Sequence, residues 1–240
     1  MRVALFVTCL VDLLRPRIGF AALELLEAAG CEVVVPAAQT CCGQPAWNSG
    51  DRAAAARLAR KTIAEFEGFE HIVAPSGSCA DHIKNEYPAI LADDPQWCAR
   101  ARALAPRVHE LTDFLVGVAG LERLPGRFAG RVTYHDSCAG LRGLGIKAQP
   151  RDLLAKLPGV ELVEMGGAEE CCGFGGAFSV KFGDVSAAIA ERKCGHACAT
   201  GAAAIVGGDL GCLLNIEGKL RRLGDEATQV LHIAEVLTAK

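Results

Sequence analysis

The stretch Glu170-Cys171-Cys172-Gly173-Phe174-Gly175-Gly176 contains two adjacent cysteines followed by a glycine-rich turn. The same arrangement stands about 130 residues earlier, in Thr40-Cys41-Cys42-Gly43-Gln44-Pro45. Two neighbouring thiolates favour a soft metal, and the glycines allow the backbone to come close to it. The two turns therefore indicate metal chemistry, and their repetition indicates an internal duplication.

Single cysteines flank each double cysteine at matching distances. Cys9 in the first half corresponds to Cys138 in the second, and Cys79 corresponds to Cys212. In each half, short apolar strands alternate with helical patterns, which is typical of a parallel sheet with right-handed crossovers. We therefore predict an α/β fold of two tandem pseudo-repeated lobes, each a small parallel sheet with helices on its faces.

Length and composition set the broad class of protein. The 240 residues are 51% hydrophobic and 22% charged, which is ordinary for a folded protein. We expect two cysteine-rich lobes, residues 1–118 and residues 130–240. A net charge of -3 and the lack of a basic stripe give no case for nucleic-acid binding. No apolar run reaches the roughly 18 residues of a membrane span, so the simplest expectation is a cytoplasmic protein.

The position of the repeated cysteines indicates a shared site. Each falls just after a predicted strand, in the loop that enters the next helix. In parallel α/β sheets these loops converge at the carboxyl edge, and helix N-termini there favour thiolates. We therefore expect two thiolate pockets, one per lobe. The expected ligands are Cys9, Cys41, Cys42 and Cys79 in the first lobe, and Cys138, Cys171, Cys172 and Cys212 in the second.

Four converging thiolates suit either zinc or an iron–sulfur cluster. The chain has twelve cysteines, and in a cytosolic protein this number indicates metal or redox chemistry more than disulfides. Structural zinc sites usually use closely spaced C-x₂₋₄-C knuckles, which the repeated positions lack. Adjacent cysteines fit more easily on different irons of one cluster. The pattern therefore favours an iron–sulfur cluster, with zinc as the alternative.

The repeated C…CCG…C pattern resembles the cysteine-rich CCG-domain family of iron–sulfur oxidoreductase subunits. That family includes a cysteine-rich component of heterodisulfide reductase and the iron–sulfur components of glycolate and glycerol-3-phosphate oxidases. Four motifs carry the resemblance over essentially the whole chain. They are Phe6-Val7-Thr8-Cys9-Leu10-Val11-Asp12, Thr40-Cys41-Cys42-Gly43-Gln44-Pro45-Ala46, Ala74-Pro75-Ser76-Gly77-Ser78-Cys79 and Cys171-Cys172-Gly173-Phe174-Gly175-Gly176.

Within that family, the motifs are most similar to members of a three-protein cytoplasmic system that oxidises L-lactate to pyruvate. The resemblance implies one or two clusters of the 4Fe-4S type and an electron-transfer role. It also implies that the partners are the other subunits of a lactate-oxidising complex. A cluster-based catalytic role in thiol/disulfide reduction is an alternative, as is a zinc-stabilised scaffold without redox function.

The sequence departs from the family at one point in each half. Many members end each half with C-x-x-C, which gives five cysteines per lobe. Here His82 and Asn215 stand in place of the last cysteines. A histidine nitrogen could serve as an additional ligand, whereas an asparagine is a poor one. His135, three residues before Cys138, could hydrogen-bond a sulfur or steer its loop.

The remaining cysteines have no counterparts in the other half. We expect Cys31 and Cys98 to pack as small hydrophobic side chains. Cys194 and Cys198 lie four residues apart on one helical face, and a core-facing pair is favoured over a metal pair. The chain carries no recognisable flavin or nicotinamide motif, so hydride chemistry would need a partner, and no catalytic residue can be assigned.

Overall fold

The structure, a computed structural model, describes residues 1–240 and contains two parallel sheets. In the first sheet the strand order is β2-β1-β3-β4, so the chain starts in the middle and winds to both edges. β1 lies between its neighbours, with Val3 opposite Val33 on one side and His71 on the other. The strands of this sheet are β1 (Arg2–Leu5), β2 (Glu32–Val34), β3 (His71–Ala74) and β4 (Val108–Glu110).

The second sheet repeats the topology of the first. Its order is β6-β5-β7-β8, and every neighbouring pair is parallel. The matching order confirms the predicted α/β fold of two pseudo-repeated lobes. The strands are β5 (Gly130–His135), β6 (Val160–Leu162), β7 (Ala204–Gly207) and β8 (Gln229–His232).

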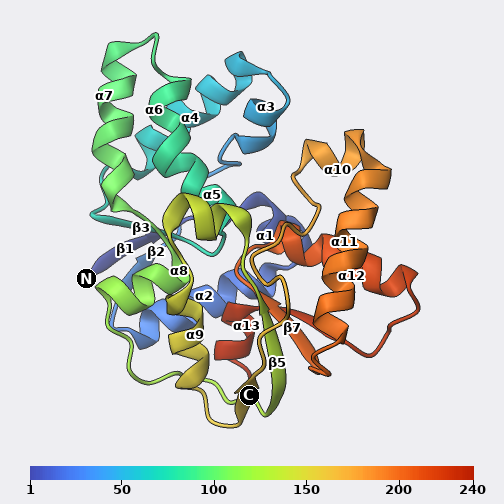
Figure 1. The fold of residues 1–240 in the computed structure, drawn as a ribbon. Helices are drawn as coiled ribbons and strands as arrows, with labels where there is room; N and C mark the ends of the chain where they lie inside the picture. The colour runs from blue at the N-terminus through green and yellow to red at the C-terminus, as the bar shows by residue number, and fades with distance from the viewer.

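Helices follow the strands of the first sheet and cover its faces (Figure 1). The longest of them begins after Asp51, whose side chain accepts a hydrogen bond from the Ala54 N–H at 2.9 Å. A side chain of this type at the N-cap satisfies a free backbone donor. The helical segments are α1 (Cys9–Leu14), α2 (Pro16–Ala28), α3 (Gln44–Asn48), α4 (Arg52–Phe66), α5 (Gly77–Asp81), η1 (His82–Glu86), α6 (Tyr87–Ile90), α7 (Pro95–Leu104), η2 (Ala105–Arg107), α8 (Leu111–Asp113) and η3 (Phe114–Val118).

The helices of the second lobe are arranged in the same way, with α11 and α12 packed against each other (Figure 1). On α12 the buried residues Leu213, Ile216 and Leu220 recur at helical spacing and form the face turned to the core. A helix that crosses a bilayer must be both long and apolar, and the protein has no such helix. The helical segments are η4 (Ala139–Gly143), α9 (Ala148–Ala155), α10 (Ala177–Lys181), α11 (Gly183–Cys198), α12 (Leu210–Arg222) and α13 (Ile233–Leu237).

The two lobes share an apolar core. The largest buried cluster combines Leu25 of α2 and Phe114 of η3 with Val132 of β5 and Ile233 of α13. α2 of the first lobe packs against α13 of the second, and Arg17 pairs with Glu235 beside that contact. Because burial of apolar surface is the main favourable term in folding, this shared core holds the two sheets in a fixed relation. That relation decides where the cysteine loops meet.

Candidate metal centre

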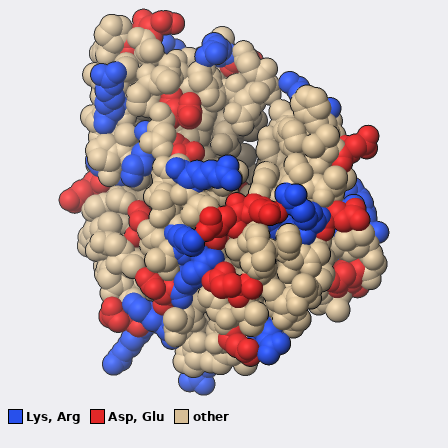
Figure 2. Space-filling model, viewed as in Figure 1, with Lys and Arg blue, Asp and Glu red and all other residues tan.

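The eight repeated cysteines line one cavity of about 330 Å³. Each stands in a loop or helix start beyond the carboxyl end of a strand, as the sequence predicts. α3 and the loop before α10 lie on opposite sides of this cavity, and Figure 2 shows a surface hollowed between the regions that carry them. The lining cysteines are Cys9, Cys41, Cys42, Cys79, Cys138, Cys171, Cys172 and Cys212.

The expectation of two separate pockets, one per lobe, is wrong, because both sets of cysteines line the same cavity. The loops after β3 and β7 are bound to each other across the lobe boundary. The Ser78 N–H donates to the Asp209 carboxylate at 2.8 Å, and the Gly77 N–H donates to the Gly208 carbonyl at 3.4 Å. These bonds bring the carboxyl edges of the two sheets face to face, so both cysteine sets open onto the same space.

In the first lobe the sulfurs form two close pairs. Cys9 Sγ lies 3.8 Å from Cys41 Sγ, and Cys42 Sγ lies 3.5 Å from Cys79 Sγ. None of the four takes part in a disulfide. Gly43, at φ 95°, turns the chain so that its N–H points to Cys41 Sγ at 3.4 Å. The turn that follows the double cysteine therefore places a backbone donor on a ligand sulfur.

The protonation of these thiols shows how the set depends on a cation. Hydrogen bonds from Cys42 and Cys9 lower the pKa of Cys41 well below the ordinary value of 9.0. The same contacts, together with burial, raise the pKa of Cys9 and of Cys42 far above the ordinary value of 9.0. One thiolate is thus stabilised by protons that its neighbours retain. Full deprotonation of the set needs a bound cation, which is the usual coupling between metal binding and proton release.

In the second lobe, the double cysteine has the same turn. The Gly173 N–H points to Cys171 Sγ at 3.2 Å, and the Phe174 N–H points to Cys172 Sγ at 3.5 Å. Cys138 and Cys171 are exposed at the cavity, whereas Cys172 and Cys212 are buried. A hydrogen bond with Cys172, together with burial, raises the pKa of Cys171. This half of the site therefore has two exposed and two buried sulfurs.

Two buried histidines stand behind the cysteines. His82 is 1% exposed, its Nε2 has no partner, and burial lowers its pKa to about 4. Its position near Cys41 fits the additional ligand predicted for the first lobe. His135 is also 1% exposed, and burial lowers its pKa to about 3. A ring nitrogen of His135 lies within 4.8 Å of the sulfurs of Cys172 and Cys212.

Side chains that no sequence motif singles out donate hydrogen bonds to the backbone of the double-cysteine turns. Tyr87 OH donates to the Cys42 carbonyl at 2.7 Å, and Asn215 Nδ2 donates to the Cys172 carbonyl at 2.8 Å. Asn215 therefore supports the turn and does not act as a ligand. The one sequence signal is its place three residues after Cys212, where the family often has cysteine.

A buried lysine adds positive charge to the second lobe. Lys193 is 1% exposed, and its Nζ donates to the carbonyls of Gly167 at 2.6 Å and Ala168 at 3.1 Å. Burial lowers its pKa, while the nearby charges of Glu170, Cys172 and Cys212 raise it. A lysine in an amphipathic helix normally faces water, so no pattern in the sequence marks this position.

The other cysteines lie outside the cavity. Cys31 and Cys98 are buried, as expected for small hydrophobic side chains, and Cys98 Sγ donates to the Pro88 carbonyl at 3.4 Å. Cys194 is buried as well, but Cys198 is exposed and its sulfur lies 3.8 Å from a carboxylate oxygen of Asp225. The interpretation of Cys194 and Cys198 as a core-facing pair is therefore wrong for Cys198, because the buried face of α11 ends with Cys194 and Ala197 and Cys198 lies beside that face.

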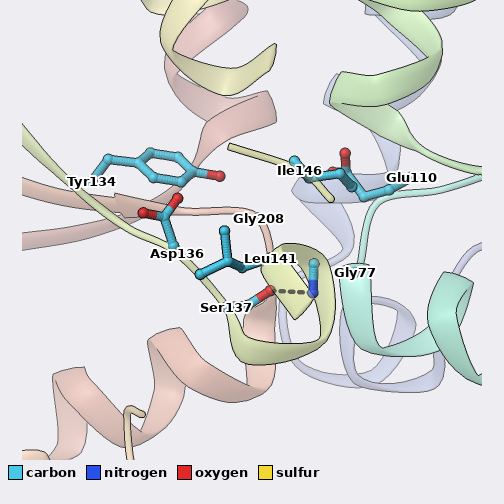
Figure 3. A pocket seen from close by; sticks show the side chains of 9 residues that line it. Gly77, Glu110, Tyr134, Asp136, Ser137, Leu141, Ile146 and Gly208 are labelled. Carbon is cyan, nitrogen blue, oxygen red and sulfur yellow. Dashed lines mark hydrogen bonds between the residues drawn. The ribbon is translucent and has the colours of Figure 1, made fainter. Parts of the chain in front are cut away.

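A second, much smaller cavity lies between the two lobes, beside the cysteine loops. Its volume of about 10 Å³ is at the lower limit for a cavity that holds one water molecule. Glu110 lies on one side, and Tyr134 and Asp136 lie on the other (Figure 3). Asp136 is paired with Arg151 through two contacts of 2.9 Å, but Glu110 Oε1 has no partner. Burial raises the pKa of Glu110 to about 7.

Comparisons with known proteins agree with this architecture. The family model of the Cysteine-rich domain (CCG) matches residues 3–84 and 132–217. Lactate utilization protein A of Geobacillus kaustophilus (strain HTA426) is 48% identical over 240 residues, with both chains covered completely. Lactate utilization protein A of Bacillus subtilis (strain 168) is 44% identical over the same length, again with complete coverage of both chains. The chain belongs to the lactate utilization protein A family, within the proteins that carry the cysteine-rich CCG domain.

One solved structure supports the fold alone. A hypothetical protein from Helicobacter pylori superposes with a TM-score of 0.65 at 12% identity. The match covers 98% of this chain and 48% of that one, so this chain spans about half the length of the solved protein. At this identity the likeness establishes a common arrangement of strands and helices, and it says nothing about chemistry.

Proposed function

We propose that this chain is an iron–sulfur electron-transfer subunit of a cytoplasmic complex that oxidises L-lactate to pyruvate. The observation that carries the metal part is the convergence of eight cysteines on one cavity. The name shared by the full-length relatives supports the lactate part. The partners are then the other subunits of that complex.

The donor set fits iron–sulfur chemistry. The first centre is held by Cys9, Cys41, Cys42 and Cys79, with His82 as an additional ligand. The second is held by Cys138, Cys171, Cys172 and Cys212. A cluster bound by such thiolates takes up and releases single electrons. The residues around it hold the sulfurs in place, through the turn N–H groups of Gly43 and Gly173.

The remainder of the reaction is assigned to other subunits. Oxidation of lactate to pyruvate releases two electrons and two protons, and the electrons need an acceptor outside this chain. The sequence carries no recognisable flavin or nicotinamide motif, so hydride removal falls to a partner. This chain then conducts electrons between the subunit that oxidises lactate and the acceptor.

Two alternative functions each have one observation in their favour. The cavity of about 330 Å³ lies at the lower end of the size range of small-ligand pockets, which favours a cluster that itself binds substrate, as in thiol/disulfide reduction. The sulfur separations of 3.5 and 3.8 Å in the first lobe favour zinc, since a tetrahedral site with Zn–S bonds of about 2.3 Å has sulfurs about 3.8 Å apart.

Metal analysis after anaerobic purification decides among these functions. We expect iron with an equal amount of acid-labile sulfide, and a cluster signal in electron paramagnetic resonance (EPR) after reduction. Stoichiometric zinc without sulfide would refute the electron-transfer proposal. A cluster spectrum that changes on addition of a thiol or disulfide, but not when partner subunits are added, would favour the catalytic alternative.

A further inference from the structure

His135 is a buried histidine whose ring has no hydrogen-bond partner. It ends β5, three residues before Cys138, and it is 1% exposed. Neither Nδ1 nor Nε2 has a partner within the protein. Buried polar groups are nearly always paired, because leaving one unpaired costs free energy. A buried imidazole with both nitrogens free therefore needs an explanation.

The surroundings of the ring supply one. A nitrogen of His135 and the sulfurs of Cys172 and Cys212 all lie within 4.8 Å of one another. The three donors come from distant parts of the chain: His135 ends β5, Cys172 lies in the loop after β6, and Cys212 lies in the first turn of α12. Imidazole nitrogen and thiolate sulfur are ligands that zinc and iron–sulfur centres both accept. The three donor atoms are therefore close enough to one another to share one metal ion.

The first lobe has a histidine of the same kind, from a different place in the sequence. His82 begins η1, three residues after Cys79, and its Nε2 is buried without a partner. The equivalent position in the second lobe is Asn215, which is bound to the Cys172 carbonyl. The second lobe therefore has no nitrogen ligand at that position. His135 instead brings a ring nitrogen close to the sulfurs of Cys172 and Cys212.

We propose that His135 is a nitrogen ligand of the second metal centre, beside Cys172 and Cys212. Each lobe then offers four cysteines and one buried histidine, although the two histidines are not related by the duplication. The nature of the bound group, an iron–sulfur cluster, rests on the proposed function. The assignment of His135 as a ligand rests on the geometry of the three side chains.

Pulsed EPR of the anaerobically purified, reduced protein tests the assignment. A nitrogen bonded to iron gives a strong nitrogen coupling, which a hydrogen-bonded nitrogen does not. Because His82 is a second candidate, the measurement is made in a His82→Ala background, with histidine labelled by ¹⁵N. We expect a strong ¹⁵N coupling in His82→Ala that disappears in His82→Ala/His135→Cys. A coupling that persists in the double variant would overturn the proposal, as would its absence from His82→Ala when the cluster signal is retained.

His135→Cys is chosen because a thiolate can keep the metal bound. Replacing an imidazole with a thiolate lowers the reduction potential of a cluster. We expect the midpoint potential of one centre to fall by at least about 59 mV, which is a tenfold change in the equilibrium constant of a one-electron reduction. His109→Ala, which changes a histidine outside the cavity, is the matched control and should leave both the coupling and the midpoint unchanged. An unchanged midpoint in His135→Cys with full metal content would contradict ligation.

The proposed function and the ligand assignment can fail separately. Protein that contains zinc without iron or sulfide would refute the iron–sulfur proposal. In that case X-ray absorption at the zinc edge still decides the role of His135. A loss of nitrogen scattering in His82→Ala/His135→Cys relative to His82→Ala would support the ligand, and an unchanged ratio of nitrogen to sulfur would overturn it. Far-UV circular dichroism shows whether each variant has folded.

Discussion

The carboxylate of Asp209 in the second lobe accepts a hydrogen bond at 2.8 Å from the backbone N–H of Ser78 in the first. Asp209 is 5% exposed, it is also 3.3 Å from Ser76 Oγ, and it caps α12 by accepting from the Gly211 N–H. Ser78 precedes Cys79 by one residue, and Asp209 precedes Cys212 by three. One buried carboxylate thus joins the starts of α5 and α12, the two helices that carry the last cysteine of each lobe.

Substitution of Asp209 should therefore affect both stability and the metal site. Asp209→Ala removes a helix cap and two contacts across the lobe boundary, and it leaves the Ser78 N–H unpaired. We expect a loss of about 2–4 kcal/mol in the free energy of unfolding, and weaker metal retention in both lobes. Chemical denaturation of the metal-free protein and chelator competition measure the two effects.

Asp51→Ala is the matched control for that prediction. Asp51 also caps a helix, since it accepts from the Ala54 N–H, but it is exposed and lies within one lobe. Its loss should cost about 1 kcal/mol and leave metal retention unchanged. Equal effects of the two substitutions would show that the link between the lobes adds nothing to the helix cap.

The two cysteine sets could be predicted from the sequence because their signals are local. The adjacent cysteines and the glycine after them specify a turn, and the strand before each motif places it at a sheet edge. The single shared cavity could not be predicted in this way. It depends on how the two sheets face each other, which contacts such as Ser78 with Asp209 decide between residues more than a hundred positions apart.

The side chains around the cysteines could not be predicted from the sequence for a related reason. Tyr87 and Asn215 hold the same carbonyl in the two lobes, but they are different residue types at unequal spacings from the cysteines. Lys193 stands in a long helix, where a lysine is normally taken for a surface residue. His135 has two orphaned nitrogens only because the strand end is buried, which a sequence pattern does not report.

Glu110 should make stability depend on pH. Its pKa of about 7 in the folded protein lies above the ordinary 4.5, so the folded state keeps this proton to a higher pH than the unfolded state. Stability from this group is complete below about pH 4.5, falls between pH 4.5 and 7, and is level above pH 7. The loss amounts to about 3 kcal/mol. Urea denaturation of the metal-free protein at intervals from pH 4.5 to 8 measures this slope.

Glu110→Gln should remove that slope. The amide resembles the neutral acid, and its oxygen can still accept from the Thr112 N–H, which now donates to Glu110 Oε2 at 2.7 Å. We expect the variant to be more stable than the wild type at pH 8 and similar to it at pH 5. Glu27→Gln, on an exposed part of α2, is the control and should keep the wild-type profile. A slope that survives in Glu110→Gln would assign it to other groups.

The hydrogen bonds to the double-cysteine carbonyls should control metal affinity one lobe at a time. Asn215→Leu removes the donor to the Cys172 carbonyl, and Tyr87→Phe removes the donor to the Cys42 carbonyl. Loss of a residue that orients a ligand typically lowers metal affinity by about 10–100-fold. We expect each variant to lose metal from one lobe only, measured as metal per chain against a chelator. Asn85→Ala, at an exposed amide, should retain the full content, and equal retention by all three would refute the role.

Lys193 should raise the reduction potential of the second centre. Its buried ammonium lies close enough to Cys172 and Cys212 to interact with their charge, and a nearby positive charge favours the reduced, more negative cluster. We expect Lys193→Met to lower the midpoint potential of one centre by at least about 59 mV, a tenfold change in the equilibrium constant of a one-electron reduction. The midpoint potential of the other centre should stay unchanged. A redox titration followed by EPR measures both. Lys181→Met, at an exposed lysine of α10, controls for loss of charge alone, and equal shifts in the two variants would place the effect in the net charge of the protein and not at Lys193.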